Sequence, residues 1–201
     1  MMNMNSYYEK RKLVFERIDR SSNMEKGLMV FLMACFTGIM AQIIIPLPWT
    51  PVPITGQTFA VLVSGLILGR KLGPLSQLLY IIVGVLGIPW FADMSGGLNI
   101  LLSANGGYIL GFVFASLFIG HISEKYSKSR NIRAMLPAML IANYICIYIP
   151  GLIVLATWQY FNLGNFPSLN ALLVMGFIPF IIGDLFKIIG ASIFSKIFLP
   201  K

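Results

Sequence analysis

The chain has 201 residues, of which 57% are hydrophobic and only 11% are charged, whereas soluble domains are usually about 25% charged. So little polar surface cannot cover a water-exposed globule, and the composition therefore excludes an ordinary soluble domain and indicates an integral membrane protein. The formal net charge of +8 has to be weighed against the distribution of the cations before nucleic acid binding is inferred.

The polar opening segment, residues 1–26, is predicted to be a charged amphipathic lead-in on the cytoplasmic side of the membrane. It interleaves carboxylates such as Glu9 and Glu16 with cations such as Lys10 and Arg17. Because of this acidic charge, and because no small-residue cleavage site follows the next apolar run, it is not a secretory signal peptide. Residues 27–201 are predicted to form one transmembrane domain.

Six apolar runs predict an all-α bundle of six transmembrane helices, since a helix needs about 20 apolar residues to cross a bilayer. The second and fourth runs are short, which indicates tilted helices or helix ends that are buried in protein. In chain order, the six runs span residues 27–45, 54–69, 74–90, 107–121, 134–157 and 171–197.

The positive charges alternate between the two sides of this predicted bundle. All Lys and Arg residues except one lie on one side, at residues 1–26, 70–71, 125–133 and 196–201. The connections on the other side contain neither residue type; they are residues 46–53, 91–106 and 158–170. By the positive-inside rule, both termini are cytoplasmic and the protein lies in the cell membrane. The net charge then reflects topology, with anionic lipid as its counterpart, which argues against nucleic acid binding.

The connections without cations are weakly polar and rich in Pro, Trp, Gly and Asn. Residues 46–53 contain several prolines, each of which fixes its own φ and restricts the residue before it. Stiff connections of this kind predict lids that fold over a pocket. The alternative is that they lie at the outer lipid interface, with Trp49 and Trp90 as interfacial aromatic residues.

The cation that breaks the alternation is Lys187, which lies in the last apolar run three residues after Asp184. An ionised group near the centre of a membrane helix costs roughly 2.5–3.5 kcal/mol, and a spacing of three places both groups on one helical face. We therefore expect the pair to face the bundle interior. Either it only neutralises itself as a buried ion pair, or it binds a ligand that has both a donor and an acceptor face.

Further polar groups lie at the predicted outer ends of the helices. Gln57 offers amide donors and an acceptor without charge; the alternative is that Thr55 caps the helix while Gln57 bonds to another helix. Asn105 and Tyr108 flank a pair of glycines. No Lys-Ser/Thr follows this glycine-rich loop, so it does not match a phosphate-binding P-loop.

Small residues recur in the first apolar run at Ala34, Gly38 and Ala41. At this spacing they allow another helix to approach closely. Packing within the same bundle and docking of a partner subunit explain them equally well.

Enzyme chemistry is not expected from the side chains in the predicted spans. The single histidine, His121, lies at a cytoplasmic helix end, and the spans contain no carboxylate pair, Ser/His set or metal-ligand cluster. No cofactor is therefore expected. There is also no ATP-binding motif, so an ATP-driven transporter built on this chain would need its ATPase from another chain.

The sequence resembles BioY, the biotin-specific substrate-binding (S) component of energy-coupling factor (ECF) transporters, along most of its length, and two stretches are the most specific part of the likeness. They are Thr-Pro-Val-Pro-Ile-Thr-Gly-Gln at residues 50–57 and Gly-Asp-Leu-Phe-Lys at residues 183–187, and the likeness runs in order from about residue 27 to 196. The sequence departs from the family pattern at residues 103–105, where Ser-Ala-Asn replaces Gly-Pro-Thr, and at Ile182, where the family has Pro.

The resemblance implies a six-helix S-component fold with a vitamin site near the outer face that is closed by the outer loops. It links Asp184 and Lys187 to biotin and adds Asn105 by position. It also implies that Ala34 and Gly38 dock on a transmembrane coupling (T) subunit, which works with ABC-type ATPase subunits.

Biotin is a reasonable match for these polar groups. Asp184 and Asn105 would meet the ureido edge, and Lys187 would neutralise a negative group of the ligand. Aromatic rings would flank the apolar ring system: those of Trp90, Phe91 and Tyr108. We therefore predict a subunit that captures and translocates biotin and has no enzyme activity. A self-sufficient transporter that uses the ion pair for proton coupling and a non-transporting scaffold are the alternatives.

Overall fold

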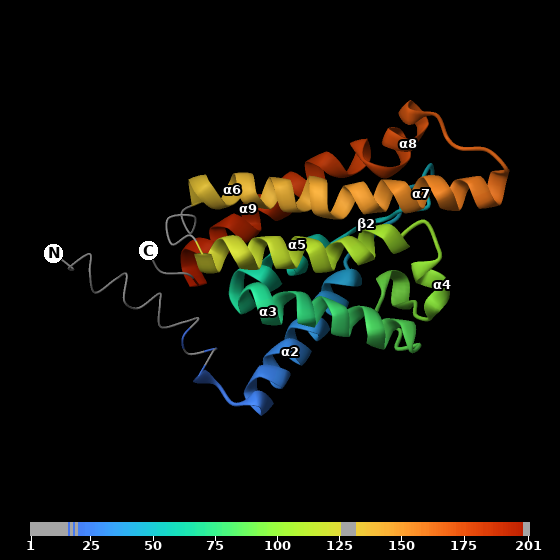
Figure 1. The fold of residues 1–201 in the computed structure, drawn as a ribbon. Helices are drawn as coiled ribbons and strands as arrows, with labels where there is room; N and C mark the ends of the chain where they lie inside the picture. Colours follow the sequence, from blue (N-terminus) through green and yellow to red (C-terminus); the bar gives the residue numbers. More distant parts are fainter. Residues whose placement is uncertain (1–15, 17, 19, 126–131, 199–201) are drawn as a thin grey trace.

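The computed structural model describes residues 16, 18, 20–125 and 132–198, and these residues are largely helical (Figure 1). Most of the predicted charged lead-in, and residues 126–131 of the predicted cation-rich connection, lie outside the described residues. The elements in chain order are α2 (Asn23–Ala41), β1 (Ile44–Ile45), β2 (Ile54–Thr55), α3 (Gln57–Val85), η1 (Ala92–Met94), α4 (Leu98–Leu101), α5 (Gly106–Lys125), α6 (Ile132–Ile141), the π-helix η3 (Ala142–Ile147), α7 (Tyr148–Leu163), α8 (Leu169–Gly176), η4 (Ile178–Phe180) and α9 (Ile181–Phe198).

Five helical stretches in the described part of the chain are long and apolar enough to cross a membrane. Large apolar side chains cover their outward faces: Phe114 on α5 is 58% exposed and Phe186 on α9 is 74% exposed. A soluble protein rarely exposes so much contiguous apolar surface, whereas lipid solvates it. The five stretches are Asn23–Ala41, Gln57–Val85, Gly106–Lys125, Ala134–Leu163 and Leu169–Phe194.

Helix α2 begins inside the segment that is predicted from the sequence to be a lead-in. Ser22 and Glu25 form a capping box, in which the Ser22 amide donates to Glu25 Oε2 (2.7 Å) and the Glu25 amide donates to Ser22 Oγ (3.2 Å). The helix therefore starts at Asn23, and it ends at Ala41, where the chain turns into β1. The predicted span of residues 27–45 began too late and extended too far.

Helix α3 reverses direction at Gly69, which has φ 75° and ψ −170°, a conformation that glycine adopts readily. Gln57, the first residue of α3, donates from Nε2 to the Tyr80 hydroxyl at 2.7 Å. A straight helix would separate these two residues by about 35 Å. The two halves of α3 therefore lie antiparallel, and they correspond to the second and third predicted spans.

Small residues allow α3 to pack closely against α5. A Cβ atom at Gly65 would lie 2.3 Å from the Ser116 carbonyl oxygen, and one at Gly120 would lie 2.5 Å from the Gly69 carbonyl carbon. The Ser64 and Ser116 hydroxyls are hydrogen-bonded at 2.8 Å. Such close approach is typical of membrane helices, and it sets α3 and α5 side by side as two walls of one pocket.

The last two predicted spans differ from the structure in their bounds. Helix α7 continues to Leu163 and is terminated by Gly164 at φ 79°, so part of the predicted 158–170 connection is helical. The final span is interrupted at Phe177 (φ −139°, ψ −60°). Pro179 follows two residues later and lacks a backbone donor, so α8 and α9 are separate helices joined by η4.

Two of the predicted outer connections are folded. Residues 46–53 join β1 to β2, whose antiparallel register pairs Ile44 with Thr55 and Ile45 with Ile54. The Thr50 hydroxyl ties this hairpin to the end of α8 by donating to the Met175 carbonyl oxygen at 2.7 Å. The second connection contains η1 and α4. Both segments lie beside the start of α5, where they shape a pocket.

Candidate ligand-binding site

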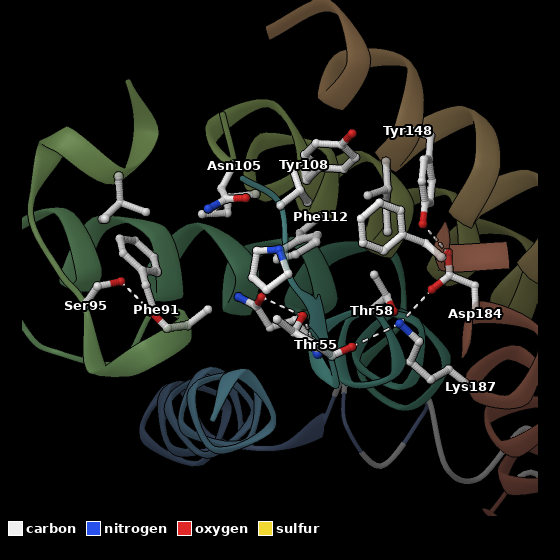
Figure 2. Close-up of a pocket in the computed structure, with 18 residues that line it drawn as sticks. Thr55, Thr58, Phe91, Ser95, Asn105, Tyr108, Phe112, Tyr148, Asp184 and Lys187 are labelled. Carbon is white, nitrogen blue, oxygen red and sulfur yellow. Dashed lines mark hydrogen bonds and ion pairs between the residues drawn. The ribbon is translucent and has the colours of Figure 1, made fainter. Parts of the chain in front are cut away.

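A pocket of about 640 Å³, part of it open at the mouth, lies among the β1–β2 hairpin, α3, α5, α7 and α9 (Figure 2). Both folded outer connections contribute walls, as the prediction of lids requires. Its mixture of apolar walls with a few polar groups is typical of small-ligand sites. The lining residues are Val52, Pro53, Thr55, Gln57, Thr58, Phe91, Ala92, Ser95, Ile100, Asn105, Tyr108, Ile109, Phe112, Ile147, Tyr148, Phe180, Asp184 and Lys187.

The predicted pair of charges lies in the pocket wall. Lys187 Nζ is 2.6 Å from Asp184 Oδ1, and the side chains are 17% and 1% exposed, respectively. Lys187 also donates to the Thr55 carbonyl oxygen of β2 at 3.0 Å. Asp184 lies in the first turn of α9, where the helix dipole favours a carboxylate. The pair therefore joins α9 to the hairpin and faces the bundle interior, as expected.

The second carboxylate oxygen of Asp184 is bound by two residues that the sequence reasoning missed. Asn143 Nδ2 donates to Asp184 Oδ2 at 2.8 Å, and the Tyr148 hydroxyl donates to the same oxygen. A buried carboxylate is costly unless it is paired and hydrogen-bonded. Here it is paired with Lys187 on α9 and receives two hydrogen bonds from the η3–α7 junction.

Gln57 lies in the pocket wall with both ends of its amide occupied. Its Oε1 accepts from the Thr55 hydroxyl at 2.9 Å, while its Nε2 donates to Tyr80. The Gln57 backbone amide donates to Thr55 Oγ1 at 3.4 Å. The bond to Tyr80, on the second half of α3, matches the alternative in which Gln57 bonds across helices, whereas the N-cap of α3 is Gly56 and not Thr55. A contact between Gln57 and a ligand stays a prediction.

Two polar side chains of the pocket have unused hydrogen-bonding capacity within the described part of the chain. Thr58 Oγ1 is buried without a hydrogen-bond partner. The Asn105 side chain is half-buried, and no hydrogen bond joins its amide to another described residue; only its backbone amide donates, to Ser103 Oγ at 3.3 Å. A ligand could satisfy both groups.

The apolar part of the pocket uses two of the three predicted aromatic rings. Phe91 is fully buried, and Tyr108 is 8% exposed. The Tyr108 hydroxyl donates to the Gly176 carbonyl oxygen at 2.8 Å, so it holds the end of α8. Trp90 is not among the lining residues: its Nε1 donates to the Tyr80 carbonyl oxygen at 2.9 Å. Trp90 thus packs against Tyr80, with ring centroids 5.3 Å apart, and lies outside the pocket lining.

The predicted docking residues are buried within this chain. Ala34 and Ala41 are both 0% exposed, and a Cβ atom at Gly38 would lie 3.2 Å from Trp90 Cβ. This placement corresponds to the packing alternative that the sequence left open. On their own, these three residues do not form an accessible surface on α2.

The sequence reasoning also missed the side chain that secures the second outer connection. Gln42, just after α2, donates from Nε2 to the Phe91 carbonyl oxygen at 3.0 Å and accepts on Oε1 from the Met94 amide at 3.1 Å. An amide in an apolar run is a visible feature of a sequence, as Gln42 and Asn143 both show. Which distant group each of them meets is not visible there.

Comparison with known proteins agrees with this geometry. The BioY family model matches residues 12–200. A probable biotin transporter BioY of Methanothermobacter thermautotrophicus is 51% identical over 138 residues, which cover 69% of this chain and 88% of the relative. The biotin transporter BioY of Thermotoga maritima is 32% identical over 151 residues, covering 75% and 83% of the two chains.

A crystal structure of the S-component for biotin from an ECF-type ABC transporter has the same fold. It superposes with a TM-score of 0.75 at 26% identity, over 88% of this chain and 93% of that chain. The resemblance that was inferred from two short stretches is confirmed over nearly the full sequence. The chain belongs to the BioY family.

Proposed function

We propose that this protein captures biotin at the outer side of the cell membrane and carries it inward as the S component of an ECF transporter. The observation that carries the proposal is the buried Asp184–Lys187 pair in a pocket with otherwise mainly apolar walls. The relatives named above are biotin transporters, and the protein is accordingly a transport protein rather than an enzyme.

Biotin supplies groups that complement this pocket. Its ureido ring offers two N–H donors and a carbonyl acceptor, and its valerate chain ends in a carboxylate. Asp184 can only accept when ionised and Lys187 can only donate, while Asn105 can do both. We place the ureido edge against Asp184 and Asn105, with Lys187 neutralising a negative group and the rings of Phe91 and Tyr108 beside the bicycle. Biotin is then the transported substrate, and no cofactor takes part.

The proposed topology has six membrane crossings with both termini in the cytoplasm. It is supported by the reversal of α3, which turns one long stretch into two antiparallel halves. Arg70 and Lys71 lie at this reversal, where the positive-inside rule places the cytoplasm. The pocket then opens towards the outer side.

The proposed partners are a transmembrane coupling (T) subunit and ABC-type ATPase subunits, because the sequence has no ATP-binding motif of its own. We propose α2 as the docking helix. In this arrangement Ala34, Gly38 and Ala41 set how closely α2 packs on its own bundle. The outward face, on which Phe31 is 50% and Ile39 is 65% exposed, contacts the coupling subunit.

Calorimetric titration of biotin into the detergent-purified chain tests the proposal. The wild type should bind biotin, and Asp184→Asn should weaken binding at least about tenfold, since hydrogen bonds to charged groups contribute roughly 1.5–3 kcal/mol. Asp93→Asn is the matched control: it makes the same chemical change at an exposed aspartate that does not line the pocket. It should bind as the wild type does.

A folded wild type that does not bind biotin would sink the assignment. If both asparagine substitutions weaken biotin binding equally, the Asp184–Lys187 pair does not contact the ligand. Vesicles that contain only this chain should not accumulate biotin against a gradient. Uptake by such vesicles would favour the self-sufficient transporter instead.

A further inference from the structure

A π-helical segment brings two donors to the buried carboxylate. The segment η3 spans Ala142–Ile147, with Asn143 near its start and Tyr148 immediately after its end. In a regular α-helix, residues five apart point about 140° away from each other. The wider turn of a π-helix brings i and i+5 towards one face. This geometry allows Asn143 and Tyr148 to donate to the same atom, Asp184 Oδ2.

These contacts determine which acceptor position Asp184 has left. A carboxylate oxygen has two lone-pair positions, and both positions of Oδ2 are occupied by Asn143 and Tyr148. Oδ1 is buried and lies 2.6 Å from the Lys187 ammonium as an ion pair, but no hydrogen bond joins it to another described residue. The acceptor capacity that is left is therefore on Oδ1, beside Lys187. A ligand that meets Asp184 there has to present a hydrogen-bond donor.

The orientation of the Asn143 amide leaves one buried polar atom without a hydrogen bond, which is unfavourable for stability. Asn143 is fully buried, and its Oδ1 has no hydrogen-bond partner among the described residues. Turning the amide over would place Oδ1 against the carboxylate, where two acceptors repel each other. Asn143 thus leaves one of its own groups unsatisfied in order to donate to Asp184, and a buried unsatisfied group of this kind calls for an explanation.

We propose that Asn143 and Tyr148 are positioning residues that fix the Asp184 carboxylate so that only Oδ1 meets the ligand, and that this clamp selects ligands with N–H donors. This inference rests on the proposed function, because the hydrogen-bond donors in question are the ureido N–H groups of biotin. Without the clamp, Oδ2 regains a free acceptor position and the carboxylate can rotate. Affinity then falls, and discrimination against ligands that lack a donor falls with it.

The test uses displacement of labelled biotin from the full-length chain in detergent, with biotin and with biotin methylated on its ureido nitrogens as competitors. Tyr148→Phe and Asn143→Leu should each weaken biotin binding about tenfold. The matched control is Tyr144→Phe, in the same π-helical segment, whose hydroxyl donates to the Ile181 carbonyl oxygen at 3.4 Å and not to Asp184. It should stay within about twofold of the wild type.

The ratio of the two affinities separates positioning from a structural role. The wild type should prefer biotin over the methylated analogue at least about tenfold, and both clamp variants should narrow this preference. An equal loss for both competitors, or clamp variants that bind like Tyr144→Phe, would overturn the inference. If Tyr148→Phe does not fold, the ratio for Asn143→Leu decides. If the folded wild type binds no biotin, the proposed function itself is refuted. If the wild type and Tyr144→Phe bind biotin but the clamp variants fail the tests above, only this inference is refuted.

Discussion

Gln57 and Tyr80 lie 23 residues apart in one helical element, yet their side chains are hydrogen-bonded at 2.7 Å. The contact is possible because α3 folds back on itself at Gly69. It also links the pocket to the second outer connection, since the Tyr80 hydroxyl donates to the Trp90 carbonyl oxygen at 3.3 Å. The reversal of α3 thus allows one hydrogen-bond network to join the pocket wall at Gln57 to the second outer connection at Trp90.

Gly69→Ala should destabilise the protein because the reversal requires a positive φ. A non-glycine residue in such a conformation costs roughly 1–3 kcal/mol. Thermal unfolding in detergent should therefore show a lower Tm. Gly27→Ala is the control, since a Cβ atom there would meet nothing within 4 Å and alanine favours a helix. An unchanged Tm for Gly69→Ala would mean that the reversal does not depend on glycine.

Asp184→Asn and Lys187→Met should each destabilise the protein by about 3–5 kcal/mol, because each leaves a buried charge without its partner. The double variant should lose less than the sum of the two single losses. Unfolding of all four proteins by denaturant measures this coupling. Strictly additive losses would show that the two side chains are energetically independent despite the 2.6 Å contact.

Thr50→Val should speed the release of biotin by loosening the hairpin that forms part of the pocket wall. The substitution keeps the side-chain shape but removes the hydrogen bond from Thr50 to the Met175 carbonyl oxygen and the one that Thr50 Oγ1 accepts from the Val52 amide. A typical hydrogen bond contributes about 0.5–1.5 kcal/mol. We expect the dissociation rate to rise roughly two- to tenfold in a stopped-flow or chase experiment. Thr157→Val is the control, since the Thr157 hydroxyl only bonds within its own helix. Equal rates for both variants would show that the hairpin is not held by Thr50.

Tyr108→Phe should reduce stability more than ligand affinity. The Tyr108 hydroxyl donates to the Gly176 carbonyl oxygen, and its loss leaves a buried acceptor without a partner, at a cost of about 1–3 kcal/mol. The ring that faces the pocket is retained, so biotin affinity should change less than about threefold. Tm and calorimetry on the same preparation separate the two effects. A tenfold loss of affinity at an unchanged Tm would instead place the hydroxyl on the ligand.

Several features of the fold were predictable because they are local. Apolar runs located the membrane helices, although the structure moved their ends by several residues at α2 and α7. The spacing of Asp184 and Lys187 predicted an inward-facing pair, since residues three apart share a helical face. The reversal at Gly69 falls at the end of the second predicted run, because glycine and the charged residues after it end an apolar stretch.

Other features were not predictable because they depend on contacts between distant segments. Asn143 and Tyr148 are separated from Asp184 by 41 and 36 residues in the sequence. Their contacts depend on a π-helical turn that the local sequence does not predict. Trp90 and Phe91 are neighbours in sequence, but only Phe91 lines the pocket. Gly38 and its neighbours could pack inward or outward from α2 with the same spacing.

The sequence by itself determined that this is a helical membrane protein of the BioY family, because composition, charge alternation and two short stretches are properties of the chain order alone. The tertiary structure decided which polar groups meet. Hydrogen bonds act over about 3 Å, so their partners follow from how the helices pack. The packing added two hydrogen bonds from the η3–α7 junction to the pair of charges in α9.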